Sequence, residues 1–473
     1  MAHAVTHPDN TQANTQTEAS DDLPEGLWLA YYGDDFTGST DVLEAFTAAG
    51  VPTVLFVQAP RPQDLARFPD ARCVGVAGQA RGKSPAWMRE HLPPVFDSLS
   101  ALGAPIVQYK VCSTFDSAPE VGSIGQAIDL GVAHTRADWS PMVVGAPRLQ
   151  RYQVFGHLFA AAQGEVWRID RHPTMSRHPV TPMHESDLRV HLAQQTPRRI
   201  GLVNLAQMTQ GQGDAGLQAL CGADQPVVML DVADALSQRE AGRLVWQQRG
   251  PGVFSASSSG LQYALAEYWR SRGWLPATPS LPQAQPVPCI AVVSGSCSPM
   301  SAAQIDWAER NGFLTERLDV AKCLVPAQAE QEIERLVALA QDAVARQVSP
   351  LVYSARGPDD PAVLGFDALV QQAGCDKAQG AERIGMALAE VMRRLLDRTD
   401  LRRIVVAGGD SSGAVASHLG VQAFTVAAGM APGVPLCRAW SDNPRRDGLE
   451  IALKGGQLGA ASFYGDVRAG HVG

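Results

Sequence analysis

Acidic residues crowd into one short segment near the start of the chain. The run Asp34-Asp35-Phe36-Thr37-Gly38-Ser39-Thr40-Asp41 holds three carboxylates within eight residues. Carboxylates this close together are costly unless a cation or a substrate hydroxyl shares them. A carboxylate at hydrogen-bonding distance can also take the proton of an attacking hydroxyl. We therefore expect Asp35 or its neighbour Asp34 to be a general base, although Asp and Gly also serve as ordinary turn and helix-cap residues.

Two cations stand at comparable places further along the first half of the chain. Arg81 follows an apolar run ending near Ala77, and Lys110 comes just before Cys112-Ser113-Thr114-Phe115-Asp116-Ser117. Arg and Lys at strand ends suit a substrate carboxylate. Each could instead be a solvated surface charge. We predict that one of them holds the carboxylate of a small anionic substrate.

The second half contains segments rich in glycine and serine. These are Ser294-Gly295-Ser296-Cys297-Ser298, Gly408-Gly409-Asp410-Ser411-Ser412-Gly413 and Leu453-Lys454-Gly455-Gly456-Gln457-Leu458-Gly459. Glycine lets backbone N–H groups approach a phosphate, and a helix N-terminus offers free donors. None of the segments matches Gly-x-Gly-x-x-Gly or a P-loop. The run beginning at Gly408 nevertheless favours a phosphate cradle over a simple tight turn.

Most of these segments follow or end expected strands. Apolar runs at 27–32, 51–57, 73–77 and 106–111 alternate with helical patterns at 40–49 and 85–102, and runs at 290–293, 351–354 and 403–407 continue the alternation. This rhythm is typical of a parallel α/β sheet, which binds ligands at the carboxyl ends of its strands. We predict an α/β protein of two domains with mainly parallel sheets and the active site in the cleft between them.

Length and composition set the domain plan. A chain of 473 residues exceeds one ordinary core. Residues 1–24 are polar and lack a hydrophobic period, which predicts a disordered tail. Residues 273–288 contain five prolines, which predicts a semi-rigid linker between domains at 25–272 and 289–473.

Charge and cysteine usage bear on partners and location. The formal net charge of -9 argues against a nucleic-acid partner. No apolar run reaches the roughly 18–20 residues of a membrane helix, and no signal-peptide layout is present, so we expect a cytoplasmic protein without a membrane partner. The eight cysteines form no Cys-x-x-Cys pair, and His172, His178 and His184 lack a zinc spacing. We therefore predict no protein-bound metal, and a homo-oligomer is left open.

Taken together and in this order, the quoted segments resemble the four-carbon acid sugar kinase family, once catalogued as a domain of unknown function. Pro432-Gly433-Val434-Pro435 adds to the resemblance. It implies an N-terminal substrate domain and a C-terminal ATP domain, with ATP and Mg²⁺ phosphorylating a hydroxyl of a small-molecule acid sugar. Gly156-His157-Leu158-Phe159 looks most like the 3-oxo-tetronate branch, so the expected substrates are 3-oxo-tetronate, threonate or erythronate.

The resemblance also implies a set of site residues. Those expected at the substrate are Asp34, Asp35, Thr37, Arg81, Lys110, Ser113 and Asp116. Those expected at ATP are Ser296, Gly408, Gly409, Asp410, Ser411 and Gly456. The chain departs from the family pattern at Gly122-Ser123-Ile124-Gly125, at Ala428-Gly429-Met430-Ala431 and at Gly456-Gln457-Leu458-Gly459. These departures bear on the substrate rather than on the kinase assignment.

Two other functions suit parts of the pattern. A haloacid-dehalogenase-type phosphatase also places aspartates after its first strand, but separates them by one residue, whereas Asp34 and Asp35 are adjacent. A non-catalytic sugar-acid binding protein would also have two α/β lobes, and the segment at Gly408 argues against it.

Overall fold

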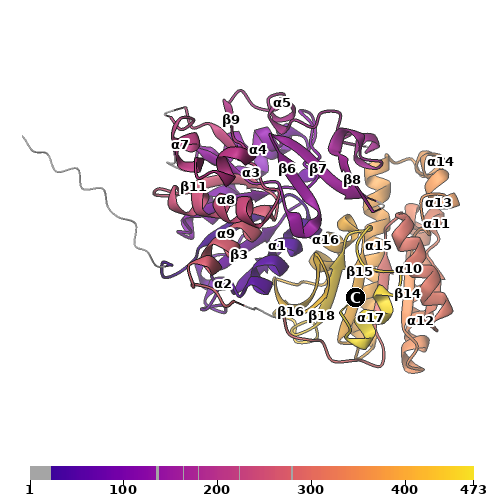
Figure 1. The fold of residues 1–473 in the computed structure, drawn as a ribbon. Helices are drawn as coiled ribbons and strands as arrows, with labels where there is room; N and C mark the ends of the chain where they lie inside the picture. The colour runs from indigo at the N-terminus through magenta and orange to yellow at the C-terminus, as the bar shows by residue number, and fades with distance from the viewer. Residues whose placement is uncertain are drawn as a thin grey trace, which may run out of the picture.

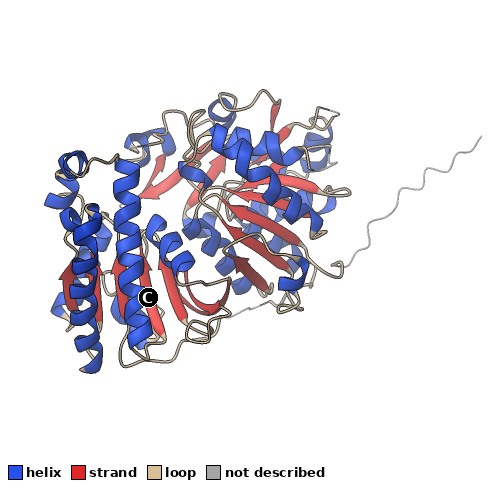
Figure 2. Cartoon of the chain, turned by 180° about the vertical axis from the view of Figure 1, so that it is seen from behind, coloured by secondary structure: helices blue, strands red, loops and turns tan. Residues whose placement is uncertain are grey.

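A long twisted sheet with helices on both faces organises the molecule (Figures 1 and 2). The computed structural model describes residues 23–134, 138–162, 164–178, 180–222, 224–277 and 281–472. Almost all of the tail expected at 1–24 therefore lies outside the described residues. The main sheet has 12 strands in the order β11-β4-β1-β3-β2-β16-β17-β18-β15-β12-β14-β13. The first five strands come from the N-terminal half and the other seven from the C-terminal half.

The N-terminal half of the sheet is parallel. Its strands are β1 (Leu29–Gly33), β2 (Thr53–Phe56), β3 (Cys73–Ala77), β4 (Ile106–Lys110) and β11 (Val253–Ser257). Helix α1 (Phe36–Ala49), which follows β1, packs on one face. Helices α3 (Pro85–Ala101) and α4 (Ile124–Val132) pack on the other face. The helix that follows β1 therefore packs on the opposite face of the sheet from the helices that follow its neighbours β3 and β4. Open α/β sheets form binding crevices at such positions.

Two smaller sheets complete this half. One is parallel, with β5 (Ser140–Met142), β9 (Ile200–Val203) and β10 (Val227–Leu230). The other is an antiparallel meander of β6 (Arg151–Val154), β7 (His157–Ala162) and β8 (Glu165–Arg168), a region in which the sequence pattern suggested no strands. The helices of this region are α2 (Pro62–Leu65), α5 (Leu188–Leu192), α6 (Leu205–Thr209), α7 (Gly213–Gln218), α8 (Ala235–Gln247) and α9 (Gly260–Ser271).

The C-terminal half has a parallel group and an antiparallel hairpin. The parallel strands are β12 (Ala291–Ser294), β13 (Leu314–Arg317), β14 (Pro350–Tyr353), β15 (Arg403–Ala407) and β18 (Glu450–Lys454). The hairpin pairs β16 (Ala423–Ala431) with β17 (Val434–Trp440). The helices are α10 (Pro299–Arg310), α11 (Val320–Leu324), α12 (Pro326–Ala345), α13 (Pro361–Leu364), α14 (Phe366–Gln372), α15 (Lys377–Arg398), α16 (Gly409–His418) and α17 (Phe463–Ala469).

The two halves are joined through the sheet itself. Strand β16 pairs antiparallel with β2, with Ala423 opposite Phe56 and Phe424 opposite Leu55. We call this pairing the β2–β16 junction. One hydrophobic cluster also continues from α1 to α16. The halves are thus not separate units that meet at a linker alone, as the proline-rich segment suggested.

Several expected boundaries need correction. Helix α1 begins at Phe36 rather than Thr40, because Asp35 caps it. Helix α16 begins at Gly409, so Asp410 and Ser411 lie in its first turn rather than in a loop. No described residue of 273–288 is in a helix or strand, and the linker at that position remains a proposal. In the part of the chain that the structure describes, no helix combines the length and apolar character needed to cross a membrane.

Candidate active site

The structure brings Asp34, Asp35 and Arg81 together at the carboxyl end of β1. Arg81 donates to both oxygens of Asp34, over 2.7 and 3.1 Å, and to both oxygens of Asp35, each over 2.8 Å. Burial raises the pKa of Asp34, and the charge of Arg81 opposes that rise. The guanidinium therefore offsets the repulsion between the two adjacent carboxylates.

Backbone hydrogen bonds fix the strand ends that carry these groups. The Asp34 amide donates to the Lys110 carbonyl over 2.9 Å, and the Arg81 amide donates to the Asp34 carbonyl over 2.9 Å. The ends of β1, β3 and β4 are thus held in register just beyond the sheet. This is the crevice position expected from the change of helix face.

Asp35 is also the N-cap of α1. Its carboxylate accepts the Gly38 amide over 2.8 Å and the Thr37 hydroxyl over 2.9 Å. A Cβ placed at Gly38 would lie 2.9 Å from Lys110 Nζ and 3.4 Å from Arg81 Nη2. Both cations therefore reach the first turn of α1, and residue 38 has no room for a side chain.

Lys110 is almost fully buried and lies 3.6 Å from a carboxylate oxygen of Asp41. The other Asp41 oxygen is buried without a hydrogen-bond partner. Both cations proposed for the substrate carboxylate thus already have carboxylate partners. A bound anion would have to share them.

The segment after β4 closes the substrate side of the site. Thr114 Oγ1 donates to Asp116 over 2.7 Å and lies 2.9 Å from Cys112 Sγ. Burial alone would raise the pKa of Asp116, but the charge of Arg81 and the Thr114 hydrogen bond hold it below its usual value. Phe115 has a φ of +59°, an uncommon backbone conformation for a non-glycine residue. Ser113 is half-buried in the same segment.

The glycine-rich segments of the second half also meet at a change of helix face. Helix α10, after β12, packs on one face of the sheet, and α16, after the adjacent strand β15, packs on the other. A Cβ at Gly295 would lie 2.1 Å from Ser411 Oγ, and one at Gly456 would lie 2.3 Å from Ser296 Oγ. The segments ending β12, β15 and β18 therefore touch one another.

The residues of this crevice differ in backbone conformation, exposure and hydrogen bonding. Gly408 has a φ of +118°, which requires glycine, and its amide donates to the Lys454 carbonyl over 2.9 Å. Asp410 is exposed in the first turn of α16. Ser298 donates to the Gly456 carbonyl over 2.6 Å. The free amides of α16 and the absence of side chains at the glycines suit a phosphate group.

The two crevices lie next to each other. A Cβ at Gly409 would be 3.9 Å from Thr37 Oγ1, and one at Gly413 would be 3.4 Å from the Phe36 ring. The first turn of α1 therefore faces the first turn of α16. The residues expected at the sugar and those expected at the nucleotide thus meet across this helix contact.

One contact between the two halves could not be predicted from the sequence. Glu44, in the third turn of α1, is buried and accepts the Gly433 amide over 2.8 Å. Burial raises the pKa of Glu44 to about 7, with the Gly433 hydrogen bond opposing the rise. Glutamate on a helix is common, so nothing marked Glu44 before its partner was known.

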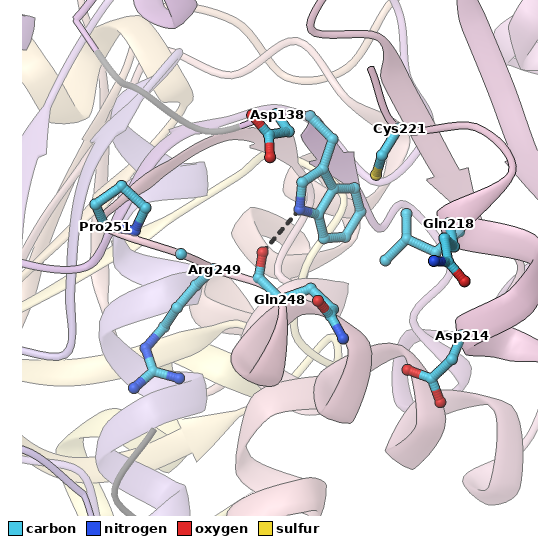
Figure 3. A pocket seen from close by; sticks show the side chains of 10 residues that line it. Asp138, Asp214, Gln218, Cys221, Gln248, Arg249 and Pro251 are labelled. Atoms are coloured by element: carbon cyan, nitrogen blue, oxygen red, sulfur yellow. Dashed lines mark hydrogen bonds between the residues drawn. The ribbon is translucent and has the colours of Figure 1, made fainter. Parts of the chain in front are cut away.

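A separate cavity of about 370 Å³ lies away from this site (Figure 3). Trp139 and Pro251 precede β5 and β11, so the cavity opens at the opposite, amino-terminal ends of these strands. The Trp139 indole donates to the Gln248 carbonyl over 2.9 Å at its wall. The described residues contain no group of three or more His, Cys, Asp and Glu side chains that could hold a metal ion.

Comparison with known proteins decides the family. A sugar-binding N-terminal domain model matches residues 29–265, and a nucleotide-binding C-terminal domain model matches residues 291–464. The 3-oxo-isoapionate kinase of Paraburkholderia graminis is 63% identical over 95% of this chain and 96% of its own length. The chain belongs to the four-carbon acid sugar kinase family.

Further relatives and solved structures match this chain at lower identity. The 3-oxo-tetronate kinase of Burkholderia multivorans is 30% identical over 92% of this chain and 95% of its own length. A solved Salmonella typhimurium LT2 structure, described as a tRNA synthase, is 25% identical with a TM-score of 0.73, covering 93% of this chain and 98% of that one. A Haemophilus influenzae structure at 23% identity has a TM-score of 0.67 and covers 93% and 99%. The α/β fold, with its sugar-binding and nucleotide-binding domains, is thereby confirmed, and the protein is a sugar acid kinase.

Proposed function

We propose that this kinase phosphorylates a hydroxyl of 3-oxo-isoapionate, with ATP as the donor. The observation that carries the proposal is the 63% identity to a 3-oxo-isoapionate kinase along nearly the whole chain, against 30% to a 3-oxo-tetronate kinase. The expected tetronate substrates are therefore replaced by a related acid sugar. The departures noted at Gly122-Ser123-Ile124-Gly125 and Gly456-Gln457-Leu458-Gly459 accord with this change.

The geometry supports a division of roles at the sugar. Asp35, or Asp34 beside it, would accept the hydroxyl proton, because Asp35 caps the first turn of α1, which faces α16. Arg81 or Lys110 would bind the substrate carboxylate, with Thr37, Ser113 and Asp116 around the sugar. Arg81 also offsets the repulsion between the two carboxylates while the site is being filled.

The nucleotide side would be formed by Ser296, Gly408, Gly409, Ser411 and Gly456. ATP supplies the phosphoryl group, and Mg²⁺ would neutralise charge on its phosphates. Asp410 is a carboxylate at the helix end that should receive phosphate, so it suits the Mg²⁺ ion rather than the phosphate itself. We further propose that 25–272 and 289–473 are the functional domains, joined at 273–288.

An ATP-consumption screen tests the substrate. We expect 3-oxo-isoapionate to give the highest kcat/KM, with 3-oxo-tetronate, threonate and erythronate at least tenfold lower. A difference of this size corresponds to about 1.4 kcal/mol, within what one altered pocket contact supplies. If a tetronate were the best substrate, the identity to the isoapionate enzyme would not report specificity. If no acid sugar stimulated ATP consumption, the kinase proposal itself would fail.

Gly409→Val tests the phosphate cradle. A Cβ at this position meets nothing closer than Thr37 Oγ1 at 3.9 Å, so the protein itself tolerates the side chain. A β-branched side chain would nevertheless block the approach of a phosphate to the α16 amides. We expect ATP affinity, measured by calorimetry, to fall at least tenfold while acid-sugar affinity and the melting temperature hold. Gly385→Val is a matched control, since a Cβ there also has room. Unchanged ATP affinity would remove α16 from the phosphate site.

The rival functions predict different results. A phosphatase of the haloacid dehalogenase type would form a phospho-aspartate on Asp34 or Asp35, which mass spectrometry would detect. A binding protein would hold the acid sugar without ATP. Family membership favours the kinase over both.

A further inference from the structure

Lys454 is a fully buried lysine whose ammonium group has no partner among the described residues. Its side chain is 0% exposed, and Nζ makes no hydrogen bond. Burial lowers the pKa of Lys454 to about 8, and no neighbouring charge contributes to that shift. A buried cation left without a counter-charge is costly, so its presence calls for an anion that comes from outside the chain.

The position of Lys454 points to the nucleotide crevice. It is the last residue of β18, opposite Ala407 of β15, and its carbonyl accepts the Gly408 amide. Side chains alternate along a strand, so Lys454 shares a face with Ala452, which packs with residues of α10 and α17. The ammonium therefore lies on the α10 face of the sheet, below the glycine segment that follows β18.

The N-terminus of α10 converges on the same place. Ser298, the N-cap of α10, and Ser301, in its first turn, both donate to the Gly456 carbonyl, over 2.6 and 3.3 Å. The positive end of a 12-residue helix and an uncompensated ammonium are thus brought to one segment. Two positive groups in one crevice repel each other unless an anion lies between them.

We propose that Lys454, together with the N-terminus of α10, binds a phosphate group of the nucleotide. The inference rests on the proposed kinase function and adds a cationic side chain to the nucleotide residues named above. Gly455 and Gly456 follow Lys454 directly, and their lack of side chains leaves room for a phosphate oxygen. Because the ammonium becomes paired, Lys454 takes up a proton when the nucleotide binds.

No other ionisable group on or around β18 pairs with the Lys454 ammonium in the part of the chain that the structure describes. Arg403 pairs with Glu450 over 2.7 Å at the far end of the strands, and Arg438 lies 3.6 Å from Asp447. None of the groups on the elements packed against β18 lies within hydrogen-bonding or ion-pair distance of the Lys454 ammonium. They are Asp41 and Glu44 of α1, Asp306, Glu309 and Arg310 of α10, Asp410 and His418 of α16, Cys437 of β17, and Tyr464, Asp466 and Arg468 of α17.

Calorimetric titration of Lys454→Met with ADP and with adenosine tests the proposal. We expect ADP affinity to fall at least tenfold, as on losing a buried charge-assisted pair, while adenosine affinity stays at the wild-type value. The variant should fold, because methionine fills the same apolar space without a charge. Lys377→Met, at an exposed lysine paired with Asp367, is the matched control.

Proton uptake gives a second readout that a purely structural lysine would not produce. At pH 8.5, ADP binding to the wild type should take up a measurable fraction of a proton, determined by calorimetry in buffers of different ionisation enthalpy. Uptake should be much smaller at pH 7 and absent in Lys454→Met. Wild-type ADP affinity in Lys454→Met, or an equal loss of adenosine affinity, would overturn the proposal. Failure of the wild type to bind ADP would overturn the nucleotide role of the whole crevice.

Discussion

Replacing Asp35 with asparagine is expected to lower kcat by about 10²–10⁴-fold, with ATP affinity little changed, and the same applies to Asp34→Asn if Asp34 is the base. Asparagine keeps the size of the carboxylate but cannot accept the proton. It is also a good N-cap, so Asp35→Asn should preserve the start of α1. Steady-state assays with the acid sugar and separate ATP titrations measure the two quantities.

Comparing the kcat values of Asp34→Asn and Asp35→Asn shows which of the two aspartates is the base. Asp34 has a raised pKa through burial, whereas Asp35 reaches the first turn that faces Gly409. Asp35→Ala removes the cap as well as the charge, so it should lose roughly 1 kcal/mol more stability than Asp35→Asn. If both asparagine variants turned over near the wild-type rate, the base would be elsewhere, and Asp116 would be tested next.

Replacing Arg81 with methionine is expected to raise the acid-sugar KM at least tenfold and to lower the free energy of unfolding by about 3 kcal/mol. The guanidinium makes four hydrogen bonds to Asp34 and Asp35, and its loss leaves two adjacent carboxylates uncompensated. Chemical denaturation and substrate kinetics give the two values. Lys110→Met should raise the same KM if Lys110 shares the substrate carboxylate.

The pH dependence of the free energy of unfolding of Arg81→Met shows whether the destabilisation comes from unpaired charge or from lost packing. Burial already raises the pKa of Asp34, and without the opposing charge of Arg81 that pKa rises further. The destabilisation is therefore present at neutral pH and shrinks as falling pH protonates Asp34. Arg61→Met, at an exposed pair with Asp64, should leave stability unchanged. A deficit that is constant from pH 7 to pH 5, together with a wild-type KM, would contradict the role assigned to Arg81.

The sequence allowed the strands and their end residues to be predicted well. The expected run 73–77 coincides with β3, and the run 403–407 coincides with β15, because short β-branched runs bounded by turn residues have few alternatives. The placement of Asp34, Arg81 and Lys110 at one crevice followed from parallel strands ending at one edge. Helix starts were predicted less accurately, because the N-caps Asp35 and Gly408 are residue types that occur equally in loops.

What the sequence could not show depends on long-range pairing. The meander β6 to β8 and the β2–β16 junction join segments whose partners are not encoded locally. Glu44 and Lys454 gain their significance from neighbours distant in the chain, the amide of Gly433 and the end of β15. Glu44 and Lys454 are recognised as functional candidates by their burial and not by their residue type.

The β2–β16 junction also limits how this protein can be divided. Cutting the chain at the proline-rich segment would leave β2 and β16 as bare strand edges, and would expose the cluster shared by α1 and α16. Such edges recruit other strands and promote aggregation. The same edges are complementary in sequence and register, however, so the two fragments produced together would have a template on which to reassemble. We therefore expect the two halves, produced together as separate chains, to reassemble through the β2–β16 junction.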